Sequence, residues 1–185
     1  MMGQIDRRSG GFTLVELLLT VTVMTILVLL AAPSFNEATL GSKLSAYANR
    51  LVASAYLARG EAIKRNALIT LCVSTDGSTC ATAGGWEQGW IVRCPSTTST
   101  SVTCTTGGSS AIIFQYQPAL PAGFKIGTAT ANQRSLVFYP TGVDPRTQAV
   151  LTVCRNAPLG KQERQVRIGA TGGASVKTTT TGTCT

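Results

Sequence analysis

The sequence predicts an α+β protein in which one long N-terminal helix, with a membrane half and an amphipathic half, packs on an antiparallel β-sheet domain. Three observations predict this fold. An uncharged apolar run covers Leu17–Phe35, an apolar stripe with helical spacing follows it, and short segments with strand periodicity fill most of the remaining chain of 185 residues. A helix that covers one face of an antiparallel sheet is the simplest architecture for this order of elements.

The composition excludes several classes of enzyme. The chain has no histidine, so it lacks Ser-His-Asp and Cys-His catalytic groups and any histidine-ligated zinc or haem. Lys and Arg number 16 against 8 Asp and Glu, which gives a formal net charge of +8. The acidic residues are scattered and form no carboxylate pair of the kind used in general acid-base catalysis. We therefore expect no enzymatic activity, no cofactor and no metal site.

The first element is the apolar run, which is long enough to cross a bilayer as a helix. Arg7 and Arg8 precede it, and positive residues on this flank predict a cytoplasmic N-terminus and an exported C-terminal part. Pro33 lies inside the predicted helix and should kink it, because proline removes one backbone hydrogen bond. A secretory signal cleaved after Ala31-Ala32 is the alternative, but the helical pattern continues past that point.

The second element is an amphipathic helix that extends to about Arg65. Its apolar residues recur at steps of three and four and form one stripe: Leu44, Ala48, Leu51, Ala55, Ala58 and Ala62. Charged residues such as Arg50 and Arg59 lie away from this line. We interpret the stripe as the face that packs on the sheet, because its alanines permit the close approach of strands. A coiled-coil seam is the alternative.

After Asn66 the pattern changes to a period of two, and turn-forming residues multiply. The predicted strands are Leu68–Ser74, Gly89–Cys94, Ala111–Gln117, Gly123–Gly127, Ser135–Tyr139, Ala149–Cys154, Gln165–Ala170 and Ala174–Lys177. The segment Ser96–Ser110 is rich in Gly, Ser and Thr and is expected to form a surface loop. Trp86 and Trp90 are expected to pack in the core or at a sheet edge, with stacking on a ligand as the alternative.

The cysteines predict an oxidising compartment. All six lie after the apolar helix, and an even number in an exported domain favours disulfides: Cys72, Cys80, Cys94, Cys104, Cys154 and Cys184. A zinc site needs closely spaced pairs of ligands, and no Cys-x-x-Cys is present. The sequence leaves the pairing open, although local spacing favours joining them in order along the chain.

The segment GGFTLVEL, Gly10 to Leu17, resembles the type IV prepilin signature. The resemblance implies that prepilin peptidase cuts between Gly11 and Phe12 on the cytoplasmic side and methylates the new N-terminal Phe12. A glycine at the cut leaves the backbone open to the peptidase. The resemblance also implies that Glu16 pairs with the N-terminal ammonium of a neighbouring subunit in the filament, where an unpaired charge would be costly.

The domain resembles the GspH/FimT group of minor pilins and pseudopilins. The likeness is carried by Leu71–Cys80, by Trp86–Val92, and by the later segments Phe138–Gly142 and Leu151–Cys154. It implies a type IV pilin-like fold. The protein would then be either a FimT/FimU-like minor pilin or a type II secretion pseudopilin. The implied parts are a cleaved leader at 1–11, a transmembrane and assembly helix at 12–35, an amphipathic spine at 36–65 and a periplasmic β-rich domain at 66–185.

The same resemblance predicts the function of a structural subunit that initiates or caps a type IV pilus-like filament. The expected location is the bacterial inner membrane, with one membrane pass and the domain in the periplasm, followed by incorporation into the filament. Other major and minor pilins or pseudopilins, prepilin peptidase and the inner membrane are the expected partners. Pilus and type II secretion machine stay open as alternatives.

DNA binding is a further alternative that we rank second. FimT-like members that bind DNA for natural transformation carry a Gly-Arg-x-Arg motif in the C-terminal strand region, where this chain reads Gly172-Gly173-Ala174-Ser175. Both arginines are missing. Candidate DNA contacts are therefore limited to the nearby cations Arg164, Arg167 and Lys177.

Overall fold

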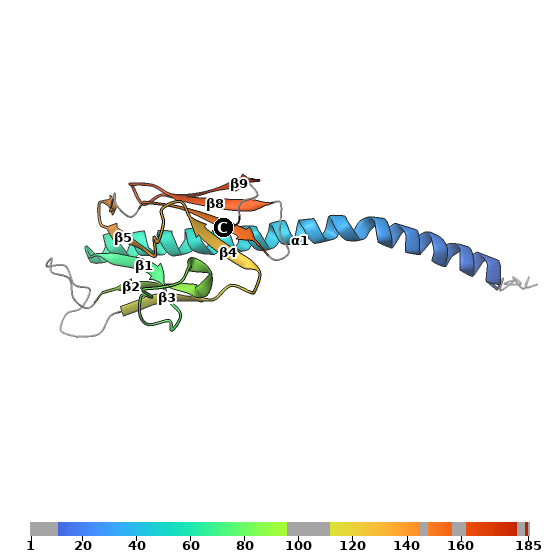
Figure 1. The fold of residues 1–185 in the computed structure, drawn as a ribbon, viewed down its shortest axis with the longest axis horizontal. Coiled ribbons are helices and arrows are strands. Elements are labelled where there is room, and N and C mark those ends of the chain that lie inside the picture. Colours follow the sequence, from blue (N-terminus) through green and yellow to red (C-terminus); the bar gives the residue numbers. More distant parts are fainter. Residues whose placement is uncertain (1–10, 96–111, 145–147, 157–161, 181–183, 185) are drawn as a thin grey trace, which may run out of the picture. The chain divides into compact units, whose positions relative to one another are not determined.

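In a computed structural model of the chain, the described residues are 11–95, 112–144, 148–156, 162–180 and 184, and their side chains are described except at 31–34 and 36. The chain divides into two compact units, Met1–Thr39 and Leu40–Thr185. Helix α1, Leu14–Arg65, contains the boundary between them. The described strands all belong to the second unit, as the colours of Figure 1 show.

Helix α1 ends in a Schellman motif. Asn66 has a φ of 49°, a left-handed conformation that asparagine tolerates better than most residues. Its N–H donates to the carbonyl of Ile63 at 3.3 Å, and the N–H of Ala67 donates to the carbonyl of Ala62 at 3.1 Å. These two bonds satisfy carbonyls that the end of a helix would leave without partners. The predicted end near Arg65 is confirmed.

The second unit contains two antiparallel sheets. The first has the strand order β3-β2-β1-β5-β6, and the second has the order β4-β7-β8-β9. A short 3-10 helix η1, Trp86–Gln88, precedes β2. The strands are β1 Ile69–Val73, β2 Gly89–Cys94, β3 Ile112–Pro118, β4 Phe124–Thr128, β5 Ser135–Tyr139, β6 Gly142–Val143, β7 Ala149–Arg155, β8 Glu163–Ile168 and β9 Ala174–Thr179. The predicted α+β class, a helix packed on antiparallel strands, is confirmed.

The division into two sheets corrects the single sheet that the sequence predicts. Two long-range pairings create it: Thr70 of β1 lies opposite Val137 of β5, and Gly127 of β4 lies opposite Thr152 of β7. Local periodicity identifies strands but carries no information about which distant strand each one joins. The predicted bounds of β2 and β5 agree with the structure, whereas β8 begins two residues earlier than predicted.

The predicted apolar stripe is the centre of the core. Each of its six residues, Leu44, Ala48, Leu51, Ala55, Ala58 and Ala62, is 0% exposed. Buried residues of both sheets join the stripe in one apolar cluster, including Leu71 from the first sheet and Leu151 from the second. The interpretation of the stripe as a packing face is therefore confirmed, and the strands lie along the same stretch of α1 in Figure 1.

Both tryptophans are buried, as core packing predicts. The indole N–H of Trp90 donates to Oγ of Ser54 on α1 at 2.9 Å, and that of Trp86 donates to the carbonyl of Gln133 at 2.8 Å. Gly89 has a φ of 107°, and a Cβ there would lie 2.6 Å from the carbonyl oxygen of Gln117. A glycine is thus required where the chain enters β2 beside β3.

Candidate processing and assembly site

The predicted cleavage site lies just before α1. Gly11, Phe12 and Thr13 are not helical, and the helix begins at Leu14. A Cβ added to Gly11 would meet no atom within 4 Å, so packing in this chain does not require a glycine there. Phe12 is 78% exposed. An open, non-helical backbone with an unhindered glycine suits entry into a peptidase.

Glu16 lies in the first turn of α1, where Thr13 caps the helix. Oγ1 of Thr13 accepts the backbone N–H of Glu16 at 3.2 Å, which is the geometry of a helix N-cap. The carboxylate of Glu16 also lies near the positive end of the helix dipole. The sequence interpretation missed Thr13, although the spacing Thr-x-x-Glu is the capping-box pattern and could have identified it.

The side chains after the cap form a bare apolar surface. Every large apolar residue between Phe12 and Leu30 is at least half exposed, from 50% at Val23 to 78% at Phe12. The hydroxyls in this segment donate to carbonyls of the same helix: Thr20 to Leu17 at 2.9 Å, Thr22 to Leu19 at 2.8 Å and Thr25 to Val21 at 2.8 Å. Such bonds suit apolar surroundings, because no hydroxyl hydrogen is left for water.

Among the described residues, no helix combines the length and hydropathy needed to cross a membrane. Pro33 lies within the bounds of α1, but its side chain is outside the described residues, so the kink at this position stays a prediction.

Disulfide bonds cross-link the second unit. Cys72 is bonded to Cys80, and Cys154 to Cys184, each with a Cα–Cα distance of 5.6 Å. These are two of the pairs that local spacing favours. Cys94 is also disulfide-bonded, but Cys104 lies outside the described residues, as does the predicted loop 96–110. No cysteine is free within the described part of the chain.

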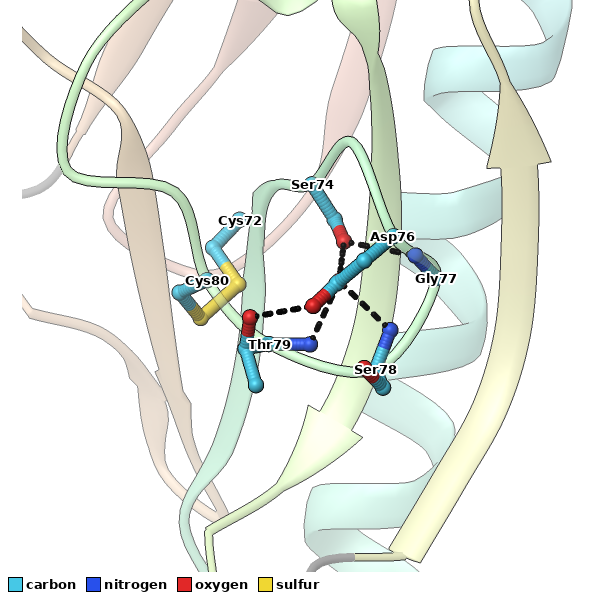
Figure 2. Close-up of a disulfide and its surroundings, with 7 residues drawn as sticks. All are labelled: Cys72, Ser74, Asp76, Gly77, Ser78, Thr79 and Cys80. Carbon is cyan, nitrogen blue, oxygen red and sulfur yellow. Dashed lines mark hydrogen bonds between the residues drawn. A yellow bond between two sulfur atoms is a disulfide. The ribbon is translucent and has the colours of Figure 1, made fainter.

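The loop closed by Cys72 and Cys80 is organised around the carboxylate of Asp76, as Figure 2 shows. Thr79 donates to it through its hydroxyl at 2.6 Å and its backbone N–H at 2.8 Å, and Ser78 donates through its N–H at 2.9 Å. These bonds, led by that of the Thr79 hydroxyl, hold the pKa of Asp76 well below its usual range. The carboxylate therefore stays ionised, and its hydrogen bonds stabilise the conformation of an exposed loop.

Only two of the three candidate DNA contacts lie on one face. Arg167 and Lys177 are exposed on the outer face of the second sheet, where Lys177 lies opposite Gln165 and diagonally across from Arg167. Arg164 points to α1 instead. Its guanidinium donates to Oγ of Ser45 at 3.0 Å and to the carbonyl of Gly41 at 3.5 Å. Arg164 thus joins β8 to the helix, which corrects its prediction as a surface contact.

Metal ligands do not gather in the described residues, where no group of three or more Cys, Asp or Glu side chains could hold an ion.

Comparisons with known proteins bear on both units. Residues 47–172 match the family described as type II transport protein GspH, and residues 6–32 match the prokaryotic N-terminal methylation motif. The second match covers Gly11, Phe12 and Glu16. No curated protein matches the sequence.

The fold is similar to that of the type IV minor pilin FimU of Pseudomonas aeruginosa strain PAO1 in two crystal forms. The structure in space group P65 has a TM-score of 0.51 and 18% identity, and the likeness covers 72% of this chain and 92% of that chain. The structure in space group P21 has a TM-score of 0.52 and 20% identity, with 74% of this chain and 89% of that chain covered. At such identities the likeness concerns the fold.

Proposed function

The chain belongs to the family of type II transport protein GspH, and we propose that it acts as a minor pilin or pseudopilin that initiates or caps assembly of a type IV pilus-like filament. The bare apolar surface between Phe12 and Leu30 is the observation that carries this proposal. A contiguous apolar surface of this extent needs lipid or protein around it. The inner membrane before assembly and neighbouring subunits after it provide those surroundings in turn.

Processing precedes assembly in this proposal. Prepilin peptidase removes residues 1–11 and methylates Phe12, and residues 12–35 anchor the subunit with its domain in the periplasm. The exposed backbone around Gly11 and the match to the methylation motif support the cleavage. The disulfides of the second unit support an oxidising compartment for the domain.

Glu16 supplies the specific contact in the filament. Its carboxylate pairs with the ammonium group of Phe12 on a neighbouring subunit, and the pair fixes the register between the two helices. Inside an apolar bundle this charge is costly without a partner. The cap does not depend on the carboxylate, because Thr13 accepts the backbone N–H of Glu16. A neutral replacement therefore removes the pairing and keeps the cap.

Glu16→Gln tests this role, and Glu37→Gln, a change at another exposed acidic residue of α1, is the matched control. We expect the Glu16 variant to be processed and to form its disulfides but to be depleted from sheared filaments, with the Glu37 variant unaffected. Mass spectrometry of the membrane-extracted protein should show an N-terminal methyl-Phe12. Wild-type recovery of the Glu16 variant in filaments contradicts the pairing, and a protein that begins after Ala32 contradicts the whole proposal.

The family description and the fold point to two machines, a type II secretion system and a type IV pilus. A deletion strain separates them. Loss of sheared pili with normal secretion assigns the subunit to a pilus, and the reverse assigns it to secretion. Immunogold labelling of intact filaments tests the initiating or capping position, which predicts label at filament ends.

DNA capture stays second, and the exposed pair Arg167 and Lys177 is the observation in its favour. Two cations on one face give weak attraction that salt screens at about 0.15 M, where the Debye length is about 8 Å. We expect only weak binding to duplex DNA at that salt. The variant Arg167→Ala/Lys177→Ala is the appropriate probe, because changing Arg164 would also disturb its contacts with α1. Saturable low-micromolar binding that this variant loses would raise DNA capture to first place.

A further inference from the structure

Strand β9 forms an open edge of the second sheet. It is the last strand in the order β4-β7-β8-β9, and Figure 1 shows it beyond β8. The N–H of Gly169 donates to the carbonyl of Gly173 at 3.0 Å, so this facing pair is hydrogen-bonded. Hydrogen-bonded pairs alternate along an antiparallel ladder. With the observed register, the N–H and C=O groups of Ala174, Val176 and Thr178 point away from β8.

One of these groups already has a partner, which supports the derived direction. The hydroxyl of Tyr56 on α1 donates to the carbonyl of Ala174 at 2.9 Å. The backbone groups of Val176 and Thr178 face no further strand in the described part of the chain. Two donors and two acceptors are thus exposed in a row, which is the pattern that lets an extended segment add to a sheet.

The side chains beside the edge are apolar on the inner face. Val176 lies opposite Val166, which is fully buried, yet Val176 itself is 39% exposed. Tyr56, which reaches the start of β9, is 48% exposed. An added strand would place every second side chain on this inner face. Its inward residue would therefore meet an aliphatic and an aromatic neighbour.

The outer face beside the edge is basic. Arg167 on β8 and Lys177 on β9 are exposed there. Glu163 is the single acidic residue in the described strands, and it is 1% exposed and accepts a hydrogen bond from the hydroxyl of Thr179. A segment with acidic side chains on its outward positions would complement these cations. The described strands of a second copy offer no exposed acid.

We propose that the free edge of β9 binds an extended acidic segment of a different subunit, which adds a strand to the second sheet. Main-chain hydrogen bonds to Val176 and Thr178 hold the segment, its apolar side chains contact Val176, and its carboxylates face Lys177 and Arg167. The partner class rests on the proposed function as a filament subunit, whereas the edge itself rests on the register of β8 and β9.

Peptide binding to the full-length processed protein in detergent micelles tests the edge. The probe is a labelled seven-residue peptide of alternating valine and glutamate, compared with one in which lysine replaces glutamate. We expect about tenfold tighter binding of the glutamate peptide by fluorescence anisotropy, and weaker binding at higher salt. Lys177→Glu should remove this preference, since it reverses the charge nearest the edge.

Val176→Pro and Thr178→Pro each delete one outward N–H and leave the hydrogen bonds to β8 intact, so each should weaken binding by about tenfold. An intact Cys154–Cys184 bond and an unchanged unfolding midpoint show that a variant is folded. Two variants are used so that, if one fails to fold, the other still tests the edge. Gln165→Ala on the central strand β8 is the matched control, because it changes the face and keeps the edge. Its binding should stay at the wild-type level.

Several results would overturn the inference. Equal affinity for the two peptides would contradict the charge preference, and wild-type binding by both proline variants would contradict binding at the edge. Self-association of the protein that the proline variants abolish, or displacement of the peptide by duplex DNA, would assign the edge to a different partner. Failure of the proposed function has a separate readout, because it means that the wild-type protein is missing from filaments. If the protein is in filaments and the peptide does not bind, only the edge inference fails.

Discussion

The two halves of α1 have the same backbone and opposite surroundings. In residues 14–30 every large apolar side chain is at least half exposed, whereas in residues 40–65 the stripe from Leu44 to Ala62 is 0% exposed. The first half is apolar on all sides, whereas the second has one buried apolar stripe, with Tyr56 and Ile63 exposed away from it. The formation of a helix therefore does not reveal what covers it, whereas the distribution of apolar side chains around its axis does.

Hydroxyl groups make the same distinction. Thr20, Thr22 and Thr25 of the first half donate only to carbonyls of their own helix. Ser54 in the second half donates to the carbonyl of Arg50 at 2.9 Å and also accepts the indole N–H of Trp90. The hydroxyls of the first half bond within their own helix, which suits apolar surroundings, whereas the Ser54 hydroxyl also joins its helix to a sheet.

Leucine-to-alanine changes in the two halves give the sharpest test of this difference. Leu51→Ala should lower the free energy of unfolding by about 2–5 kcal/mol, because it leaves a cavity in the core of the second unit. Leu19→Ala, the matched change in the exposed half, should leave this free energy unchanged and lower recovery in filaments. Denaturant unfolding of the detergent-solubilised protein measures the first effect. Equal destabilisation by both would refute the distinction.

Covalent bonds are the next difference, since the disulfides lie in the second unit. Removing the Cys154–Cys184 bond by a double serine change should cost about 3–4 kcal/mol, and removing Cys72–Cys80 about 2–3 kcal/mol. The order follows from the closed loops, which have sequence separations of 30 and 8 residues. Thermal unfolding under identical conditions compares the two. If removing the bond of the shorter loop lowers the stability more, the entropy of the unfolded chain is not the main source of the stabilisation by these disulfides.

Thr13→Ala tests whether the first half is stabilised locally. Loss of the N-cap bond to Glu16 should destabilise the first turn by about 1 kcal/mol. Amide exchange at Leu17, whose N–H donates to the carbonyl of Thr13, should become faster. The unfolding midpoint of the second unit should not move. Thr13→Ser keeps a hydroxyl and should behave like the wild type.

The smallest expected effect concerns pH in the loop around Asp76. Its pKa is depressed in the folded protein, so its contribution to loop stability is fully present above about pH 4 and is lost as the pH falls below that value. Exchange of the Ser78 and Thr79 amides should therefore show an added acid-dependent opening that Asp76→Asn lacks. The change should be confined to the loop, because Asp76 is exposed. A normal carboxyl titration midpoint by NMR would contradict the depressed pKa.

Much of the fold could be predicted from local pattern. The stripe from Leu44 to Ala62 follows from spacing alone, and the bounds of β2 and β5 follow from period-two runs with turn residues at each end. The Cys72–Cys80 bond could be favoured because a short loop closes readily, and the Cys154–Cys184 bond because these two cysteines are consecutive along the chain. The short elements β6 and η1 give no periodic pattern, so nothing local identified them.

Arg164 shows where the interpretation of the candidate site went wrong. It was grouped with Arg167 because both lie in one basic cluster of the sequence, although they alternate in the strand. Arg164 shares the parity of the buried residues Val166 and Ile168, so the pleat turns it to α1, and Arg167 faces outward. The signal was present, but it required the start of β8 to be placed at Glu163.

The sequence by itself determined the parts of this protein that depend on neighbours along the chain. These are the N-terminal methylation motif that includes Gly11, the apolar half of α1 and the buried stripe, because each is a pattern of residues close together in the sequence. Tertiary structure alone decided the division into two sheets, the contact of Arg164 with Ser45 and the free edge at Val176. Each depends on which distant segments meet, and that is fixed by burial of the whole core.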